Sequence, residues 1–264
     1  MAVVCNSCEM FFNSEFLLPA RQSVGRFLQR NLVPVIDFKE RLMQWNFRTE
    51  HEIFRALIGD DFGPRPELEK EKIRKVKLGI AESIAQTLQL ESHHTILDLG
   101  SGTGYLAAPI AAKVKIVHCA DISPAFLKWC RRETSGLANV QYHLIRSGDL
   151  SCLNAASIDK GYSEDVFIHF NLFDITLYLR ELNRVLKPGG QFLCKFHDSD
   201  CLDVNHDVFF QKMQEVYRQD RSSIFTVVQW NSGMAITAVA KQYGFRETKI
   251  IQDSSSAKLV FLEK

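Results

Sequence analysis

The chain has 264 residues, of which 46% are hydrophobic and 24% are charged, and these globular proportions exclude wholesale disorder. Its 32 basic and 31 acidic residues give a formal net charge of +1, so no long-range field would gather a nucleic acid, and such a partner is disfavoured. The longest uncharged stretch, residues 222–240, holds too many polar side chains for a membrane span.

The seven cysteines are an odd number, and they are spread through segments with the pattern of buried strands and helices. This usage is typical of free thiols in a reducing compartment. The first basic residue, Arg21, follows Glu9 and Glu15, which does not match a secretory signal. We therefore expect a cytoplasmic protein.

Cys5 and Cys8 lack a second pair of ligands, so we expect no metal there.

Residues 1–64 are rich in aromatic side chains, contain no alternation of strands and are interrupted at Pro19 and Pro34. They predict an N-terminal helical cap, whose aromatic residues pack in a core or line an apolar acceptor pocket. The apolar run at residues 16–18, followed by Arg21, Arg26 and Arg30, also leaves peripheral contact with a membrane open.

Residues 65–264 predict a second, larger domain. Apolar residues from Ile73 to Leu88 recur every three or four positions, which predicts a helix over Glu67–Leu90. Short β-rich runs alternating with helices follow, at Thr95–Leu99, Lys115–Asp121, Val140–Ile145, Ile158–Ser163 and Gln191–Phe196. Strands separated by helices predict crossover connections and a mostly parallel sheet.

Local signals mark the ends of the helices in this domain. Ser123 followed by Pro124 predicts an N-cap and a helix through Cys130. A helical repeat over residues 175–186 is stopped by Lys187-Pro188-Gly189-Gly190. Near the C-terminus we expect a helix over Ala235–Tyr243 closed by Gly244. Two strands near Phe245–Ile251 and Lys258–Leu262, joined by the turn Asp253–Ser256, must run antiparallel.

Residues 198–232 form an insertion between the fifth strand and the last helix. We expect a helix over Asp207–Tyr217 and an apolar run over Ile224–Trp230, which together with the N-terminal cap form a lid. The polar segment His197-Asp198-Ser199-Asp200 carries donors that suit a divalent ion. A polar loop leading into a helix explains the same residues, and we favour that interpretation and expect no metal.

The most informative stretch is Ile96–Leu106, an apolar strand that runs into Gly100-Ser101-Gly102-Thr103-Gly104 and then into a helix. Glycines permit positive φ and close approach of the backbone, so a ligand is expected against this turn. Amides at the following helix start favour an anionic group. The next strand ends in Asp121, where a carboxylate accepts hydrogen bonds from two ribose hydroxyls. Together these features indicate a nucleoside-containing ligand.

Details of the turn narrow the choice of nucleoside. A dinucleotide fingerprint needs Gly-x-Gly-x-x-Gly, whereas Tyr105 stands where the third glycine should be. No Gly-Lys-Ser or Gly-Lys-Thr follows, so the turn is not a phosphate loop of the ATPase type. Asp98 would repel a pyrophosphate but would pair with an ammonium group. An amino-acid-bearing nucleoside therefore fits better than a phosphorylated one.

With these motifs, the chain resembles a class I S-adenosylmethionine-dependent methyltransferase from Thr95 to Gly190, in particular the small-molecule branch that includes quinone-biosynthesis enzymes. The resemblance implies a Rossmann-like, doubly wound α/β sheet of about seven strands, mostly parallel with an antiparallel C-terminal strand. It also implies S-adenosyl-L-methionine as cofactor and S-adenosyl-L-homocysteine as product. The residues it assigns to the cofactor are Asp98, Gly100, Ser101, Gly102, Gly104, Asp121, Ile122, Asp149, Leu150 and Ser163.

Within that set, the resemblance places Asp98 and the glycines near the methionine moiety and Asp121 near the ribose. Ser147-Gly148-Asp149-Leu150 matches the family's third motif, which implies Asp149 near the adenine amino group and the Leu150 amide beside the base. Tyr162-Ser163-Glu164 resembles the family's segment at the end of the fourth strand, which implies that Tyr162 and Glu164 lie beneath the cofactor and next to the acceptor. Arg184–Gly190 matches the family's lead into the fifth strand.

Transfer of a methyl group from a sulfonium is an in-line displacement, so the main task of the protein is to align the acceptor. A general base is needed only when the acceptor must lose a proton, and His169 and His197 are the candidates by position. We expect an enzyme that methylates a small, partly apolar metabolite. A protein or RNA methyltransferase, or a cofactor-binding scaffold without transferase activity, remains as an alternative.

Overall fold

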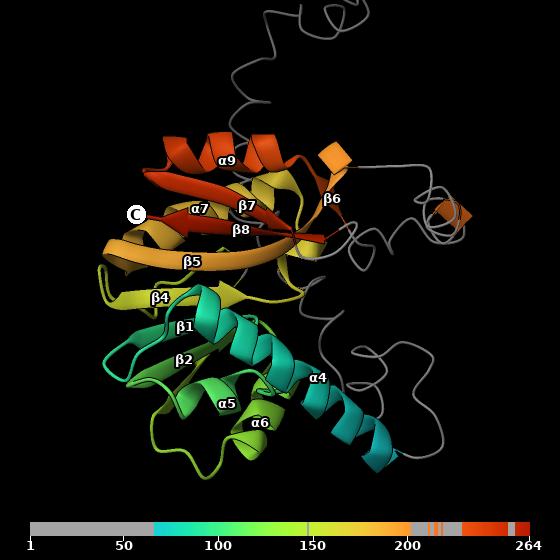
Figure 1. Cartoon of the computed structure of the whole chain (residues 1–264), viewed down its shortest axis with the longest axis vertical. Helices are drawn as coiled ribbons and strands as arrows, with labels where there is room; N and C mark the ends of the chain where they lie inside the picture. Colours follow the sequence, from blue (N-terminus) through green and yellow to red (C-terminus); the bar gives the residue numbers. More distant parts are fainter. Residues whose placement is uncertain are drawn as a thin grey trace, which may run out of the picture. The chain divides into compact units, whose positions relative to one another are not determined.

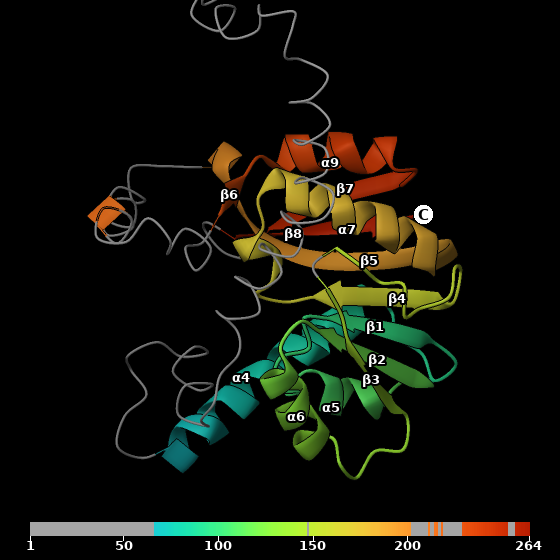
Figure 2. The same cartoon turned by 180° about the vertical axis from the view of Figure 1, so that it is seen from behind.

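The computed structural model describes residues 66–146, 148–201, 229–252 and 257–264, together with Gln211, Gln214, Glu215 and Arg218 (Figure 1 and Figure 2). The described strands form one mixed sheet in the order β3-β2-β1-β4-β5-β8-β7, with β6 beside β5. They are β1 (Thr95–Leu99), β2 (Ile116–Asp121), β3 (Val140–Leu144), β4 (Ile158–Ser163), β5 (Leu186–Asp198), β6 (Trp230–Asn231), β7 (Glu247–Gln252) and β8 (Ala257–Glu263).

Strand direction gives the sheet a functional edge. β3, β2, β1, β4 and β5 run parallel, and β6 is parallel to β5. Only β8 is reversed among the described strands, and it is antiparallel to both β5 and β7. The predicted Rossmann-like sheet with an antiparallel C-terminal strand is therefore confirmed. The carboxyl ends of five parallel strands meet at one edge, which is where open α/β sheets bind ligands.

Helices cover both faces of the sheet (Figure 1 and Figure 2). One face carries α4 (Pro66–Thr87), α5 (Ala107–Ala111) and α6 (Pro124–Glu133), and the other carries α7 (Leu172–Val185) and α9 (Gly233–Gln242). Ile96 packs in the cluster below α4, α5 and α6, whereas its neighbour Leu97 packs in the cluster below α7 and α9. This alternation follows from the two-residue period of a strand.

The helices begin where the side chains cap them. Ser123 Oγ accepts a hydrogen bond from the Phe126 amide at the start of α6, with Pro124 in the first turn, as the sequence predicts. Asn171 begins α7 with a capping box completed by Asp174. Ser232 begins α9, and Gly244, with a φ of +91°, follows that helix.

Several predicted bounds are exact and others need correction. β1 and β4 match the predicted ranges residue for residue. β5 begins at Leu186 rather than Gln191, because Leu186 already pairs with Ile158, and Lys187–Gly190 bulges out before pairing resumes at Gln191. The two-residue strand β6, at the end of the predicted lid, was not expected from the sequence.

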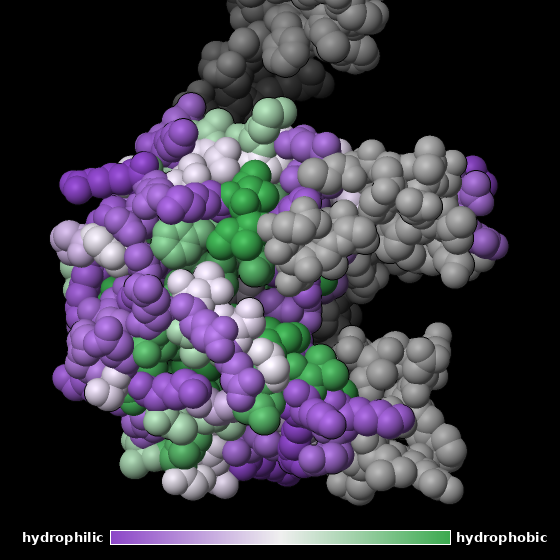
Figure 3. Space-filling view, in the orientation of Figure 1, coloured by the Kyte–Doolittle hydropathy of each residue, from purple (hydrophilic) through white to green (hydrophobic). Residues whose placement is uncertain are grey.

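The apolar face of α4 is buried only in its C-terminal half. Ile84 and Leu88 are buried, whereas Val76 is 61% exposed. In Figure 3, hydrophobic side chains lie in separate patches among hydrophilic ones on this side of the molecule. No helix in the described part of the chain is long and apolar enough to cross a membrane.

Some predicted features lie outside the described residues. These are the helical cap over residues 1–64 with Cys5 and Cys8, most of the helix Asp207–Tyr217, the run Ile224–Trp230 apart from its last two residues, and the turn Asp253–Ser256.

Candidate functional site

The glycine turn, residues 100–104, joins the end of β1 to α5. Gly100, Gly102 and Gly104 have φ values of +77°, +51° and +83°, in the region that favours glycine. Steric contact also requires glycine at position 100, because a Cβ atom on Gly100 would lie 2.1 Å from Val166 Cγ2. The Gly100 amide donates to the Ala120 carbonyl at 2.7 Å, which holds the turn against the end of β2. Backbone atoms therefore form much of the surface that this turn presents.

Asp98 lies in β1 immediately below the turn. It is 2% exposed, and its Oδ2 atom has no hydrogen-bond partner in the described part of the chain. The pKa of Asp98 is raised to about 7, mainly by burial and also by the charge on Asp121, against the opposing effects of the Tyr162 hydroxyl and Lys77. A buried carboxylate oxygen without a donor is costly, so this position suits a ligand that brings a donor or a positive charge.

Tyr162 and Ser101 surround the same position. Tyr162 of β4 is paired in register with Asp98, is 1% exposed, and its hydroxyl has no hydrogen-bond partner among the described residues. Ser101 Oγ, in the glycine turn, is likewise buried without one. Three polar atoms without hydrogen-bond partners thus lie in or beside one turn.

Asp121 ends β2 and binds the glycine turn directly. Its Oδ2 accepts a hydrogen bond from the Gly102 amide at 2.9 Å, and its Oδ1 accepts one from the Ser123 amide at 2.8 Å. Burial raises the pKa of Asp121 to about 6, although these amide hydrogen bonds act in the opposite direction. Each carboxylate oxygen keeps a second lone pair for a ligand hydroxyl. Ile122, the next residue, is half-buried against the core below α7.

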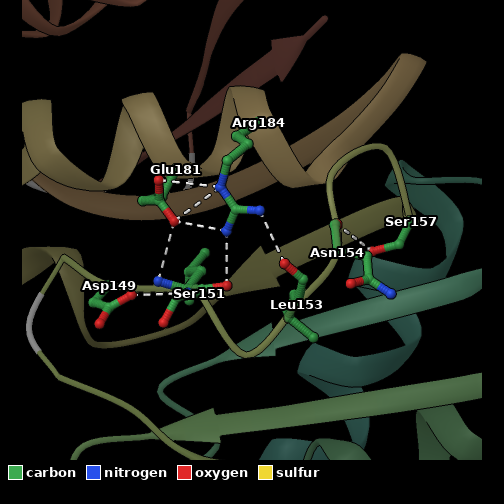
Figure 4. A network of polar contacts seen from close by, with 8 residues as sticks. Asp149, Ser151, Leu153, Asn154, Ser157, Glu181 and Arg184 are labelled. Carbon is green, nitrogen blue, oxygen red and sulfur yellow. Dashed lines mark hydrogen bonds and ion pairs between the residues drawn. The ribbon is translucent and has the colours of Figure 1, made fainter.

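Asp149 and Leu150 lie in the segment after β3. Asp149 Oδ1 accepts a hydrogen bond from the Ser151 amide at 2.8 Å, and this contact lowers the pKa of Asp149. The Leu150 amide, which the resemblance assigns to the adenine, donates to Glu181 Oε2 of α7 at 3.3 Å (Figure 4). That amide already has an acceptor within the protein. Ser147 is outside the described residues.

Residues at the end of β4 contact both neighbouring strands, β1 and β5. Ser163 Oγ donates to the Leu99 carbonyl at 2.8 Å, which joins β4 to the end of β1 beneath the glycine turn. Glu164 forms an ion pair with Lys195 of β5, with 3.0 Å between Oε1 and Nζ. Burial raises the pKa of Glu164, the charge on Asp165 raises it further, and Lys195 opposes both.

Two lysines that the sequence did not single out complete this charged cluster. Asp165 Oδ2 lies 2.8 Å from Lys77 Nζ of α4, and its Oδ1 lies 3.3 Å from Lys195 Nζ. Burial favours the neutral form of Asp165, but Lys77 and Lys195 outweigh it and lower its pKa. These residues come from three separate elements, so no local spacing marks them; the adjacent acids Glu164 and Asp165 at a strand end are the only sequence signal.

His169 and His197 lie near each other; His169 follows β4, and His197 is the next-to-last residue of β5. His169 ends the 3₁₀ helix Phe167–His169, and His197 packs beside the ring of Trp230 in β6, with centroids 5.1 Å apart. Burial lowers the pKa of His169, and His197 lowers it further, whereas Asp165 raises it. The imidazole of His169 is therefore mostly neutral at pH 7, the form that accepts a proton.

Asp198 and Asp200 serve the start of α9. Asp198 Oδ1 accepts hydrogen bonds from the amides of Asp200 and Gly233, both at 3.0 Å. Asp200 Oδ2 accepts from Ser232 Oγ and from the Met234 amide. They thus bind backbone amides at the start of α9. Within the described ranges, no three His, Cys, Asp or Glu side chains are grouped to hold a metal ion.

The structure thus gathers most of the assigned residues at the carboxyl edge of the parallel strands. The Asp121 carboxylate contacts the glycine turn, Ser163 joins the strand beneath it, and Asp98 lies directly below. Asp149 and Leu150 are on a neighbouring segment that is bound to α7, and the two histidines are at the ends of β4 and β5. This arrangement can hold a nucleoside with a positively charged tail, and it leaves the histidine side for a second substrate.

Comparison with known proteins identifies the domain. A family profile described as a methyltransferase domain matches residues 97–194. A demethylmenaquinone methyltransferase of Clavibacter sepedonicus is 35% identical over 109 residues, which are 38% of this chain and 40% of the relative. A ubiquinone/menaquinone biosynthesis C-methyltransferase of Rubrivivax gelatinosus is 36% identical over 102 residues, 38% of each chain.

The fold is shared with solved methyltransferases. The crystal structure of magnesium protoporphyrin IX methyltransferase from Synechocystis PCC 6803 with bound S-adenosylhomocysteine matches with a TM-score of 0.60 and 14% identity, covering 86% of this chain and 99% of that one. Residues 97–194 thus match a methyltransferase domain, and this part of the chain is similar in sequence to methyltransferases of menaquinone and ubiquinone biosynthesis. The chain spans about two fifths of the length of the two curated relatives described above, so the similarity does not extend to the whole protein.

Proposed function

We propose that this chain is an enzyme that transfers the methyl group of S-adenosyl-L-methionine to a small, partly apolar molecule. The observation that carries the proposal is the buried Oδ2 atom of Asp98, which has no hydrogen-bond partner in the described structure and lies beneath a turn made of positive-φ glycines. The methyltransferase-domain match over residues 97–194 supports the same conclusion.

The residues present fit the cofactor by their chemistry. Asp98 offers a carboxylate to the ammonium group of the amino-acid tail, and Ser101 Oγ offers an acceptor and a donor beside it. Asp121 keeps lone pairs for the two ribose hydroxyls after accepting the Gly102 and Ser123 amides. Asp149 keeps its Oδ2 atom for the amino group of the base, because Oδ1 is used by the Ser151 amide.

The bound cofactor supplies an activated methyl group on a sulfonium, and the residues of the chain bind, orient and accept protons. The glycine turn and Asp121 would hold the nucleoside, which leaves the histidine side of the edge for the acceptor. Asp98 is negatively charged once an ammonium group replaces water beside it. His169 or His197 accepts a proton on a ring nitrogen where the acceptor is an alcohol, a phenol or an activated carbon.

The acceptor side lies between the end of β4 and the histidines. Glu164 is held by Lys195, so we propose that it shapes this side rather than acting as a base. Tyr162 lies beside Asp98, beneath the cofactor residues. The cap over residues 1–64, the lid over 198–232, peripheral membrane contact and the cytoplasmic location stay predictions.

Calorimetry and turnover test the proposal together. The protein should bind S-adenosylhomocysteine, and Asp121→Ala should weaken binding at least tenfold, because two ribose hydrogen bonds to a charged acceptor are lost. Thr237→Ala, on the exposed face of α9, is the control and should bind normally. Unchanged affinity in Asp121→Ala would remove this residue from the site.

Methyl transfer from labelled donor to a panel of quinols, phenols and other small apolar acceptors decides between the functional alternatives. Turnover of one of them supports the proposal. Cofactor binding without turnover of any small molecule, protein or RNA would favour a scaffold. Transfer only to protein or RNA would replace the proposed substrate class.

A further inference from the structure

The segment that carries Asp149 is shaped largely by side chains of another element. Between β3 and β4, residues 148–153, here called the adenine loop, include no helix or longer strand. The Asp149 carboxylate binds the Ser151 amide within the loop, and the Leu153 amide donates to the Leu150 carbonyl at 2.9 Å. Such local bonds shape the loop but do not fix its position relative to the sheet.

Arg184, in the last turn of α7, binds the adenine loop at two carbonyls (Figure 4). Its Nη2 donates to the Leu150 carbonyl at 2.8 Å, and its Nη1 donates to the Leu153 carbonyl at 2.9 Å. A planar guanidinium holds two acceptors at a fixed separation, which a single ammonium cannot do. The guanidinium therefore fixes both the position and the orientation of the loop.

Glu181, on the same helix, contacts both Arg184 and the adenine loop. Its Oε2 lies 2.7 Å from Arg184 Nη2 and accepts a hydrogen bond from the Leu150 amide at 3.3 Å. The two side chains of the pair thus hold both the amide and the carbonyl of Leu150, the residue that follows Asp149. The side chains of Leu150 and Leu153 are buried in the core below α7, so the loop is held by polar and apolar contacts together.

The spacing of residues along α7 explains how this helix contacts the whole adenine loop. Leu177, Glu181 and Arg184 are four and three residues apart and share one helical face. At the other end of the loop, a Cβ atom on Gly148 would lie 2.8 Å from Leu177 Cβ, so the backbone of the loop lies directly on this face. The loop therefore follows α7 through about two helical turns, ending at Gly148 beside Asp149.

We propose that Arg184 and Glu181 are positioning residues that set the Asp149 carboxylate for recognition of the amino group of the adenine. This inference rests on the proposed function, because it takes the ligand to be an adenosyl compound. The pair acts through the loop and touches neither the methyl group nor the acceptor. Its loss should change which base is preferred as well as how tightly the ligand binds.

The test compares two ligands that differ only along the base edge next to Asp149, where the 6-amino group is replaced by an oxygen and N1 gains a hydrogen. S-adenosyl-L-homocysteine carries the 6-amino group, whereas S-inosyl-L-homocysteine carries an oxygen there and presents an acceptor to the carboxylate. The ratio of their dissociation constants measures recognition of the amino group. We expect wild-type protein to favour the adenosyl compound by about tenfold or more, the effect of a hydrogen bond to a charged group.

Arg184→Ala should lower that ratio to within about twofold of the ratio in Asp149→Ala, and Arg184→Lys should give an intermediate value, because it keeps the positive charge but donates from a single nitrogen. Glu181→Gln should also reduce it, since the amide group holds Arg184 less strongly. Arg180→Ala is the matched control, because it removes an exposed arginine of the same helix and should leave the ratio unchanged. Circular dichroism melts identify the variants that are folded. If Arg184→Ala does not fold, Arg184→Lys still tests the inference.

The outcomes separate the inference from the proposed function. If Arg184→Lys and Glu181→Gln weaken both ligands equally, the pair has only a structural role and the inference is wrong, whereas cofactor binding stands. A wild-type ratio near one also overturns it, because Asp149 then reads no amino group. If wild-type protein binds neither compound, the proposed function fails, and the inference fails with it.

Discussion

Asp98 holds a carboxyl group at a position where the cost of burying its charge outweighs the favourable effects of Tyr162 and Lys77. It is buried, and its Oδ2 atom has no hydrogen-bond partner in the described structure, whereas both oxygens of Asp121 accept backbone amides. A neutral side chain of the same shape would avoid the cost of burying charge. The carboxylate is therefore best explained by a positively charged group of a ligand, which fits the amino-acid tail of the proposed cofactor.

The first prediction concerns the pH dependence of stability at Asp98. Its pKa is about 7 in the folded protein against an ordinary value near 3.8, so between about pH 4 and pH 7 the folded state binds more protons than the unfolded state. The free energy of unfolding must then fall as pH rises through this window, by up to about 1.4 kcal/mol per pH unit from this group. Asp98→Asn is always neutral there, so it should already be more stable than wild type at pH 5, and the difference should grow until about pH 7 and be largest at pH 8.

Urea unfolding of ligand-free protein from pH 5 to pH 8 measures this difference. Glu82→Gln, on the exposed face of α4, removes the same charge at the surface and should run parallel to wild type. If Asp98→Asn is the less stable protein at pH 8, the carboxylate has a stabilising partner within the protein, and the argument for a ligand at this position is lost.

Residue type and order are sufficient to single out Asp98, Asp121 and the glycine turn as candidates, because each belongs to one short stretch of chain. They were insufficient for Lys77 and Lys195, which reach Asp165 and Glu164 from α4 and β5. The sequence marks Arg184 only as part of the lead into the fifth strand. Its contacts with Leu150 and Leu153 depend on packing between elements, which spacing along the chain does not encode.

At the scale of elements, the sequence predicts best those strands whose ends are marked by polar residues or glycine. β1 is bounded by a polar loop and by Gly100, and β4 ends at its junction with the acidic residues Glu164 and Asp165. β5 was predicted too short, because its first residue pairs with Ile158 before a bulge at Lys187–Gly190 that reads as a turn. β6 has two residues and exists through pairing with His197 and Asp198, so no local pattern marks it.

The second prediction belongs to α4, which carries a glycine in its interior. Gly79 is exposed, and a Cβ atom there would meet no neighbouring atom within 4 Å. Gly79→Ala should therefore raise the free energy of unfolding by about 0.5–1 kcal/mol, because alanine restricts the unfolded chain and favours the helix. Thermal unfolding should show an increase in Tm of about 1–4 °C.

The matched control is Gly244→Ala, just beyond α9. Its φ of +91° is one that alanine adopts only with strain, so the same substitution should lower stability by about 1 kcal/mol or more. If both substitutions stabilise the protein, backbone conformation does not govern these two positions as described. If Gly79→Ala destabilises it, α4 is not a regular helix at this point in solution.

At the scale of the whole molecule, the two edges of the parallel strands differ in how polar groups are satisfied. At the amino edge, Asp159 pairs with Lys187 at 2.6 Å, and Lys264 Nζ donates to the Leu186 carbonyl at 2.8 Å. At the carboxyl edge, polar atoms of Asp98, Ser101 and Tyr162 are buried without hydrogen-bond partners in the described structure. At the amino edge these polar groups are paired within the protein. At the carboxyl edge the polar atoms of these three residues would gain partners from a bound ligand.

The last prediction follows from this difference between the edges. A ligand that binds only the folded domain at 100 times its dissociation constant raises the free energy of unfolding by about 2.7 kcal/mol. For a domain of this size, S-adenosylhomocysteine should therefore raise Tm by about 5–10 °C. NAD at the same concentration should raise it far less, because Tyr105 replaces the third glycine of the dinucleotide motif and Asp98 repels a pyrophosphate. Asp121→Ala should lose most of the shift while keeping a cooperative melt. An equal or larger shift with NAD would assign the edge to a different nucleotide, because the glycine turn and Asp121 would then serve a ligand that Asp98 should reject.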